Sequence, residues 1–258
     1  MQKILTTQTM RHSDAGEIAR GTSGRELMYR AGVGIFQSCD WNGRIAILAG
    51  SGNNAGDGYV LAKLLADVGK QCYIIRCANR CSADGAYYLE MAKSAGVEIT
   101  EELQFSRVDI VVDCLLGTGF HGELRSDLKK VVADVNAFRG FVLSVDINSG
   151  LHGDTGAGNC ICSNRTVSIG FMQPGHLVGL HKSVMQEVYN YDIGIPCEGK
   201  YIPFYEAEET PVFLPEVHEF PMELANQMES AGITFGSIAE RLQQYQAPIR
   251  NRIHFFKV

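Results

Sequence analysis

Short apolar runs alternate with amphipathic stretches along most of the chain. Runs such as RIAILAG and DIVVDCLLG have the character of strands that are buried on both faces of a sheet. The stretches between the runs repeat their apolar residues at helical spacing, as in YVLAKLLADVGK, which closes at Gly69. Strands that alternate with helices of about 10–15 residues predict an α/β fold with a doubly wound, mostly parallel sheet.

The pattern places each expected element on a definite segment. The strands are expected over residues 44–50, 71–77, 109–117, 141–147, 165–171 and 187–196. The helices are expected over residues 12–38, 59–70, 82–96 and 123–138. Ser82 is the expected N-cap of the third helix.

The chain of 258 residues is expected to form one domain and a tail. An acidic segment with two prolines, over residues 206–216, follows the last expected strand, so we place the domain at residues 1–217. Residues 218–258 carry two short helical patterns and are expected to form a C-terminal helical extension rather than an independent domain. The extension either packs on the main domain or contacts another chain.

Glycine is the compositional oddity, because the chain has 28 of them where about 18 are usual for its length. Many of them lie in three loops, over residues 50–58, 117–122 and 150–158, and each loop follows an expected strand. Ligands of doubly wound sheets bind beyond the carboxyl ends of the strands. The three loops therefore predict one shared binding site.

Charge and cysteine content narrow the function classes. A net charge of −6 disfavours a broad nucleic-acid surface, which needs clustered Lys and Arg. No apolar run has the length of a signal peptide or of a membrane span. The eight cysteines include no CxxC pair, so free buried thiols in a reduced cytoplasmic protein are expected rather than zinc ligands.

The first glycine loop, GSGNNAGDG, joins a strand to a helix, where backbone N–H groups bind phosphates. Its spacing, GxGxxxG, differs from the dinucleotide fingerprint GxGxxG, and no Gly-Lys-[Ser/Thr] of a Walker loop follows. Asp57 in this loop either caps the helix or meets a ribose hydroxyl or another polar group of the substrate.

Two further carboxylates, Asp113 and Asp146, end apolar strands. An uncompensated carboxylate is costly there, so each either caps the following helix or turn or converges with the other on a cation, a ribose or a reacting atom. The carbonyl, hydroxyl, amide and carboxylate oxygens of these loops suit a hard cation. His121 and His152 also lie on glycine loops, where exposure to solvent is commoner than catalysis.

The motifs GNNAGDG, DCLLGTGFHGELR and SVDINSGLHGDTG, in this order, closely resemble the NAD(P)H-hydrate epimerase family, the YjeF N-terminal domain. RELMYRAG and DIGIP strengthen the resemblance, which covers about residues 1–205. The resemblance implies a Rossmann-like three-layer αβα sandwich. It also implies interconversion of the R and S forms of hydrated NADH and NADPH (NADHX and NADPHX), and a bound potassium ion.

The family's site residues carry over position by position. The resemblance implies potassium ligands at Asn54, Asp113 and Ser149. It implies substrate contacts at Asn53, Asn54, Ala55, Gly56, Asp57, Gly117, Thr118, Gly119, Phe120, His121, Gly122, Glu123 and Asp146. The chain departs from the family's usual glycine, proline and lysine at Ala55, Asn148 and Gln173, and Lys182 is a candidate to replace that lysine.

Chemistry at C6 of the hydrated ring needs a carboxyl group that gives and takes a proton, and we expect this group to be Asp146. The alternative is a catalytically silent nucleotide-binding or scaffold module of the same fold. An NAD(P)-dependent oxidoreductase is disfavoured because no catalytic Tyr-Lys pair stands out. We expect a homodimer whose functional partner is a separate NAD(P)HX dehydratase, since the chain is too short to contain one.

Overall fold

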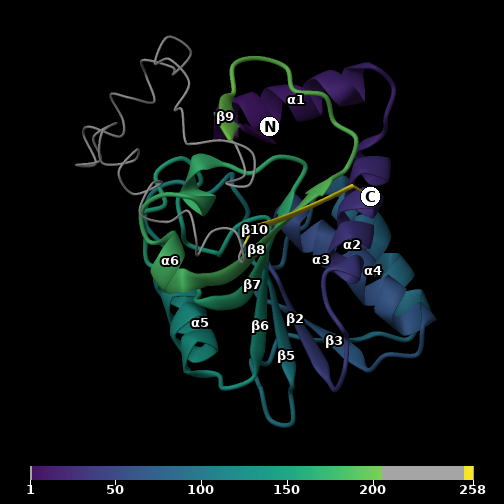
Figure 1. The fold of residues 1–258 in the computed structure, drawn as a ribbon. Coiled ribbons are helices and arrows are strands. Elements are labelled where there is room, and N and C mark those ends of the chain that lie inside the picture. The colour runs from purple at the N-terminus through teal and green to yellow at the C-terminus, as the bar shows by residue number, and fades with distance from the viewer. Residues whose placement is uncertain (1, 205–252, 258) are drawn as a thin grey trace.

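An eight-stranded parallel sheet forms the centre of the molecule in the computed structural model, which describes residues 2–204 and 253–257 (Figure 1). The strand order is β10-β8-β7-β6-β5-β2-β3-β4. The strands are β2 (Ile45–Ala49), β3 (Cys72–Arg76), β4 (Glu98–Thr100), β5 (Ile110–Cys114), β6 (Phe141–Val145), β7 (Ser163–Ile169), β8 (Met185–Asp192) and β10 (Ile253–Lys257). A separate antiparallel pair joins β1 (Gln2–Ile4) to β9 (Ile202–Phe204).

Helices cover both faces of the sheet (Figure 1). The longer helices are α1 (Thr7–Ala19), α2 (Gly24–Gln37), α3 (Asn53–Asp67), α4 (Ala83–Ser94) and α5 (Ser126–Ala137). A 3-10 turn η1 (Pro174–His176) and the short α6 (His181–Val184) precede β8. Helices α2, α3 and α4 pack on one face and α5 on the other, so the predicted three-layer αβα sandwich is confirmed.

Strand β2 shows why the apolar runs become central strands. All five of its residues are buried. Ile45 and Ile47 belong to the core that α2, α3 and α4 cover, whereas Ala46 and Leu48 belong to the core under α5. A strand that faces helices on both sides must be apolar at every position, which is the pattern that the sequence shows.

The expected helix over residues 12–38 is wrong in its extent, because two helices occupy this region. Thr6 caps α1 and Ser23 caps α2, each accepting a hydrogen bond from a backbone N–H three residues on. Gly21, with φ of 112°, turns the chain between them. The hydroxyl caps are local signals that the apolar periodicity alone does not reveal.

The expected extension over residues 218–258 lies outside the described residues except for 253–257. These residues form β10, which pairs in parallel with β8 at the edge of the sheet, so this part of the extension is not helical. The segment IHFFK is rich in aromatic and β-branched residues, which favour strands. The short strands β1, β4 and β9 were also not expected from the sequence.

The eight cysteines are free thiols, but the prediction of buried thiols holds only for Cys114 and Cys160, because the other six are partly or fully exposed. Within the described ranges, His, Cys, Asp and Glu residues form no group of three or more that could hold a metal. None of the helices in that same part of the chain is long and apolar enough to span a membrane.

Candidate active site

The predicted site residues meet where the central strands end. Asp113 lies near the end of β5 and pairs in register with Ser144 of β6, and Asp146 directly follows β6. The loop that continues β5 and the loop that continues β6 are thereby brought side by side. This arrangement follows from the parallel sheet, because the carboxyl ends of neighbouring strands share one edge.

Asp113 is fully buried and joins the two loops by hydrogen bonds. Its Oδ1 accepts from the Leu115 amide at 3.2 Å and from the Ser149 hydroxyl at 2.5 Å. Its Oδ2 accepts from the Ser144 hydroxyl and the Ser149 amide, both at 2.9 Å. Burial raises the pKa of Asp113, and these hydrogen bonds oppose the rise. The carboxylate caps the turn after β5 and fastens it to the loop after β6.

Asn54 reaches the same loops from the first turn of α3. Its Nδ2 donates to the carbonyl oxygens of Leu116, at 3.0 Å, and Val145, at 3.2 Å. Ser149 Oγ lies 3.1 Å from the same Leu116 oxygen. The three residues proposed as cation ligands, Asn54, Asp113 and Ser149, therefore converge around Leu116.

The Oδ1 atom of Asn54 is buried and has no hydrogen-bond partner within the described part of the chain. Only 6% of the residue's surface is exposed, so solvent does not satisfy this oxygen. A buried acceptor without a partner costs about 1–3 kcal/mol. Such an atom indicates a place for a donor or a cation.

Asp146 adopts a left-handed backbone conformation, with φ of 65°, which is rare for a residue other than glycine. Its own amide donates to Val167 O at 2.7 Å, which helps to hold this conformation. Oδ2 accepts hydrogen bonds from Thr118, at 2.7 Å from the amide and 3.0 Å from the hydroxyl. Burial raises the pKa of Asp146, and the Thr118 hydrogen bonds lower it. Strain at a residue of this kind is typical of functional sites.

His176, on η1, fixes the backbone of Asp146 from the other side. The ring is fully buried, and its Nδ1 accepts a hydrogen bond from the Gln173 amide at 3.0 Å. The proton therefore lies on Nε2, which is 2.8 Å from the carbonyl oxygen of Asp146. Burial lowers the pKa of His176, so the ring is neutral. Sequence reasoning missed this residue, because nothing in FMQPGH indicates a contact with the loop after β6.

Two further carboxyl groups, Asp57 and Asp14, lie where the charge of Asp146 raises their pKa. Asp57 does not cap α3, whose N-cap is Gly52 with no side-chain hydrogen bond. Burial raises the pKa of Asp57 well above its usual range, and the charges of Asp146 and Asp14 add to the effect. Asp14, on α1, was not singled out from the sequence. Its pKa is raised to about 6 by burial and by the charge of Asp146.

The loop over residues 117–122 contacts α1 at its outer side. Arg11 Nη2 lies 3.3 Å from Gly119 O and 3.1 Å from His121 Nε2. His121 Nδ1 in turn lies 3.3 Å from His152 Nε2. The two histidines thus pair with each other, and both are at least partly exposed to solvent.

The other residues proposed for substrate contact differ in exposure. Asn53, Gly119, Gly122 and Glu123 are exposed, and Phe120 packs partly against the α5 core. Ala55 and Gly56 are buried inside α3, where a Cβ on Gly56 would lie 2.5 Å from the Met28 side chain. Their side-chain positions therefore serve helix packing. Some of the surplus glycines, such as Gly56, are therefore explained by close packing between helices rather than by contact with a ligand.

The departures from the family pattern are accommodated inside the protein. Asn148 Nδ2 donates to Ile161 O, Val184 O and Ser163 Oγ, at 2.8, 3.0 and 3.0 Å. Gln173 is fully buried, and its Nε2 donates to Phe171 O at 2.7 Å. Gln173 therefore does not present its amide at the surface. Lys182 lies exposed on α6.

Comparison with known proteins agrees with this geometry. Residues 24–175 match the family described as YjeF-related protein N-terminus. The chain is 31% identical to an NAD(P)H-hydrate epimerase of Lentilactobacillus buchneri over 206 residues, which are 76% of this chain and 96% of the relative. It is 34% identical to an NAD(P)H-hydrate epimerase of Rhodopirellula baltica, over 67% of this chain and 76% of the relative.

Longer relatives and one solved structure extend the comparison. The bifunctional NAD(P)H-hydrate repair enzyme Nnr of Escherichia coli is 31% identical over 66% of this chain, which spans 35% of that enzyme. The crystal structure of the yeast protein YNL200c has the same fold, with a TM-score of 0.65 and 19% identity over 75% of this chain and 90% of the yeast chain. The matched residues include the strand-end loops that hold Asn54, Asp113, Asp146 and Ser149, and on these grounds the chain belongs to the YjeF N-terminal family.

Proposed function

We propose that this chain is an NAD(P)H-hydrate epimerase, an isomerase that interconverts the R and S forms of NADHX and NADPHX. The observation that carries the proposal is Asp146, a carboxyl with a raised pKa on a strained backbone at the end of a central strand. Two relatives that match most of the chain bear this name. A carboxyl whose pKa is raised by burial keeps its proton to a higher pH, which suits a group that must give and take a proton.

The reaction requires that a hydroxyl leave C6 of the reduced ring and that water return to the other face. The protonated Asp146 carboxyl gives its proton to the hydroxyl oxygen, and the C6–O bond breaks as the ring nitrogen forms a C=N bond. The ionised carboxylate then stabilises the positive charge of this iminium. Thr118 directs the carboxyl with two hydrogen bonds, and His176 holds its backbone.

The residues at the strand ends also support the proposal of a bound potassium ion. Asn54 offers a buried oxygen without a partner, and the carbonyl of Leu116 and the hydroxyl of Ser149 lie beside it. The carboxylate of Asp113 forms no ion pair with a side chain in residues 2–204. Neutral and anionic oxygens of this kind suit a hard cation. The ion would supply positive charge that fastens the loops after β5 and β6.

Potassium is expected to stabilise the fold. A cation that binds only the native state raises the melting temperature, here by about 2–4 °C for each kcal/mol of binding free energy. The Tm in potassium chloride is compared with that in choline chloride at equal ionic strength. Asn54→Leu should abolish the difference, and an equal Tm for the unmodified protein in both salts would contradict the potassium site.

Three further proposals follow from the family resemblance. The chain acts as a homodimer in the cytoplasm, and a separate NAD(P)HX dehydratase consumes one of the two epimers. The E. coli relative is named a bifunctional NAD(P)H-hydrate repair enzyme, which supports a functional link between epimerisation and a second repair activity. The two enzymes need not bind each other, because epimerisation and dehydration can share a freely diffusing substrate.

Epimerisation is tested with catalytic amounts of purified protein and NADHX that is enriched in one epimer. Separation by HPLC follows the ratio of the epimers over time, and the protein should accelerate the change strongly over buffer. A rate equal to that in buffer would instead favour the nucleotide-binding or scaffold module of the same fold. Binding of NADHX without turnover would identify that module positively.

Gly117→Ala is expected to reduce epimerisation by about 10–100-fold, because small displacements of catalytic groups have effects of this size. The new Cβ would lie 2.4 Å from Asp146 Oδ2 and would push the carboxyl from its place. The matched control is Gly24→Ala on α2, where the new Cβ would approach only the flexible carboxylate of Asp84 within 3 Å. Initial rates of both variants are compared, and wild-type activity of Gly117→Ala would contradict the placement of Asp146.

A further inference from the structure

Helix α1 carries a row of polar residues toward the candidate active site. Thr7, Arg11 and Asp14 lie at positions i, i+4 and i+7, so they share one face of the helix. The Thr7 amide and hydroxyl each donate to the Asp154 carboxylate at 2.8 Å, and Arg11 contacts Gly119 in the loop after β5. The shared face is therefore turned toward the two strand-end loops, and Asp14 lies one turn beyond Arg11.

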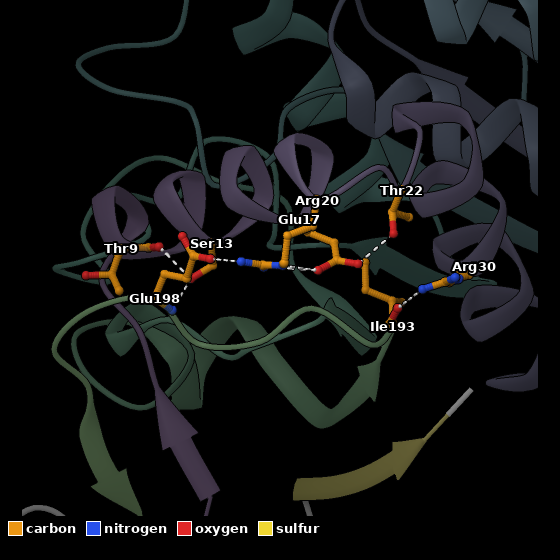
Figure 2. A network of polar contacts seen from close by, with 8 residues as sticks. All are labelled: Thr9, Ser13, Glu17, Arg20, Thr22, Arg30, Ile193 and Glu198. Carbon is orange, nitrogen blue, oxygen red and sulfur yellow. Dashed lines mark hydrogen bonds and ion pairs between the residues drawn. The ribbon is translucent and has the colours of Figure 1, made fainter.

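A second set of contacts holds α1 along its length (Figure 2). The amide of Glu198 donates to Ser13 Oγ at 2.9 Å, and the Glu198 carboxylate pairs with Arg20. Glu17 joins the same network through Arg20 and the hydroxyl of Thr22. Because these contacts lie on both sides of Asp14 in the sequence, they fix the helix backbone that carries Asp14.

The charges around Asp14 distinguish it from the other two carboxyls. The charge of Asp146, in the loop after β6, raises the pKa of Asp14. The charge of Asp14 in turn raises the pKa of Asp57, on α3. The cation on its own helix, Arg11, is engaged with Gly119 and His121, and His176 is neutral. Burial raises the pKa of Asp57 well above its usual range, whereas the pKa of Asp14 is raised only to about 6, which lets Asp14 ionise near neutral pH.

We propose that Asp14 is the second acid–base group of this site, and that it works with Asp146 from the opposite side of the reacting carbon. The inference rests on the proposed epimerase activity. The geometry supports it, because Asp14 belongs to the helix that crosses above the strand ends whereas Asp146 belongs to the end of β6 (Figure 1). The partnerless Oδ1 of Asn54, which the proposed potassium ion would contact, lies in the same group of strand-end residues.

Two carboxyls, one protonated and one ionised, complete the reaction without any other reagent. Asp146 protonates the hydroxyl, the C6–O bond breaks, and the nitrogen lone pair forms the C=N bond. A water oxygen then bonds to C6 from the other face, Asp14 accepts its proton, and the C=N pair returns to nitrogen. Proton exchange with solvent restores the starting state, and in the reverse reaction the two carboxyls exchange roles.

Asp14→Asn is expected to lower kcat/KM by about 100-fold, the usual size of an acid–base contribution. In the wild-type protein kcat/KM should fall below about pH 6, where Asp14 is protonated and no longer accepts a proton. In Asp14→Asn the decline of kcat/KM at low pH should disappear. In Asp14→Glu part of the rate should return, together with the decline at low pH. The control is Asp40→Asn, which removes an exposed carboxyl and should leave rate and pH profile unchanged.

Stability separates this role from a structural one. A carboxyl whose pKa rises on folding stabilises the fold fully below its unfolded pKa of 3.8, and that contribution is lost as the pH rises through about 6. Asp14→Asn should therefore raise the Tm at pH 7.5, by about 2–4 °C, and leave it unchanged near pH 4. A carboxylate with a purely structural role would give a lower Tm in the variant at pH 7.5.

Carbon-13 titration of the intact protein without substrate gives a readout that does not depend on activity. The pKa of Asp14 should be near 6 in the wild-type protein, held there chiefly by burial, and this titration should be absent from Asp14→Asn. A pKa near 4 in the wild-type protein would overturn the inference, as would wild-type rate and pH profile in Asp14→Asn. An inactive wild-type protein would overturn the proposed function instead, and the titration would still decide whether Asp14 can act as a base near neutral pH.

Discussion

Asp146→Asn is expected to abolish epimerisation, with a loss of about 10²–10⁴-fold in kcat/KM, while the protein stays folded. Asparagine has nearly the same shape, so it can keep the hydrogen bonds from Thr118 with its amide oxygen. It cannot give a proton to the leaving hydroxyl or balance the charge of the iminium. It also tolerates the left-handed backbone at this position better than most residues.

Asp146→Asn is measured by initial rates and by thermal unfolding under the same conditions. A Tm close to that of the wild-type protein, together with the loss of rate, assigns the loss to chemistry. Asp146→Ala provides a second comparison, because it also removes the acceptor of the Thr118 hydrogen bonds. Near-normal turnover in Asp146→Asn would remove the assignment of this residue.

The largest effect on stability is expected for Asp113→Ala, at about 3–5 kcal/mol in the free energy of unfolding. The carboxylate accepts four hydrogen bonds in a fully buried position, from Leu115, Ser144 and two groups of Ser149. Alanine leaves the Leu115 amide, the Ser144 hydroxyl and the Ser149 amide without this acceptor, and a buried donor in this state costs about 1–3 kcal/mol. Partial relaxation and entry of water keep the total below the sum of the three costs.

Ser144→Ala is the matched control for Asp113→Ala. It removes only one of the four donors and should cost about 1 kcal/mol. Both free energies come from urea unfolding with the same fitted slope. Equal losses in the two variants would mean that Asp113 does not join the loops in the way described.

The sequence predicts the sheet well because its strands are encoded locally. The five residues of β2 are apolar, and the hydroxyl of Ser82 caps α4 as expected. Asp113 and Asp146 could be placed at strand ends for the same reason, since each follows an apolar run. The sequence also predicts that the two residues lie close together, because neighbouring parallel strands end at one edge of the sheet.

The remaining parts of the site depend on contacts between distant segments, which no local pattern encodes. His176 reaches Asp146 only through the path of the loop before β8. Asp14 lies 132 residues before Asp146 and meets it because α1 is a separate helix, whereas periodicity predicted one helix through that region. Asp57, interpreted as a possible helix cap, does not cap α3, and burial together with the charge of Asp146 raises its pKa.

The most direct test of the account starts from each epimer of NADHX in turn, with catalytic amounts of the purified chain. We predict that both samples reach one common ratio of R to S, many times faster than in buffer, and that Asp146→Asn leaves both at the buffer rate. Two samples that keep separate ratios, or that change only in proportion to the amount of protein, would contradict the claim that this strand-end site is the active site of an epimerase.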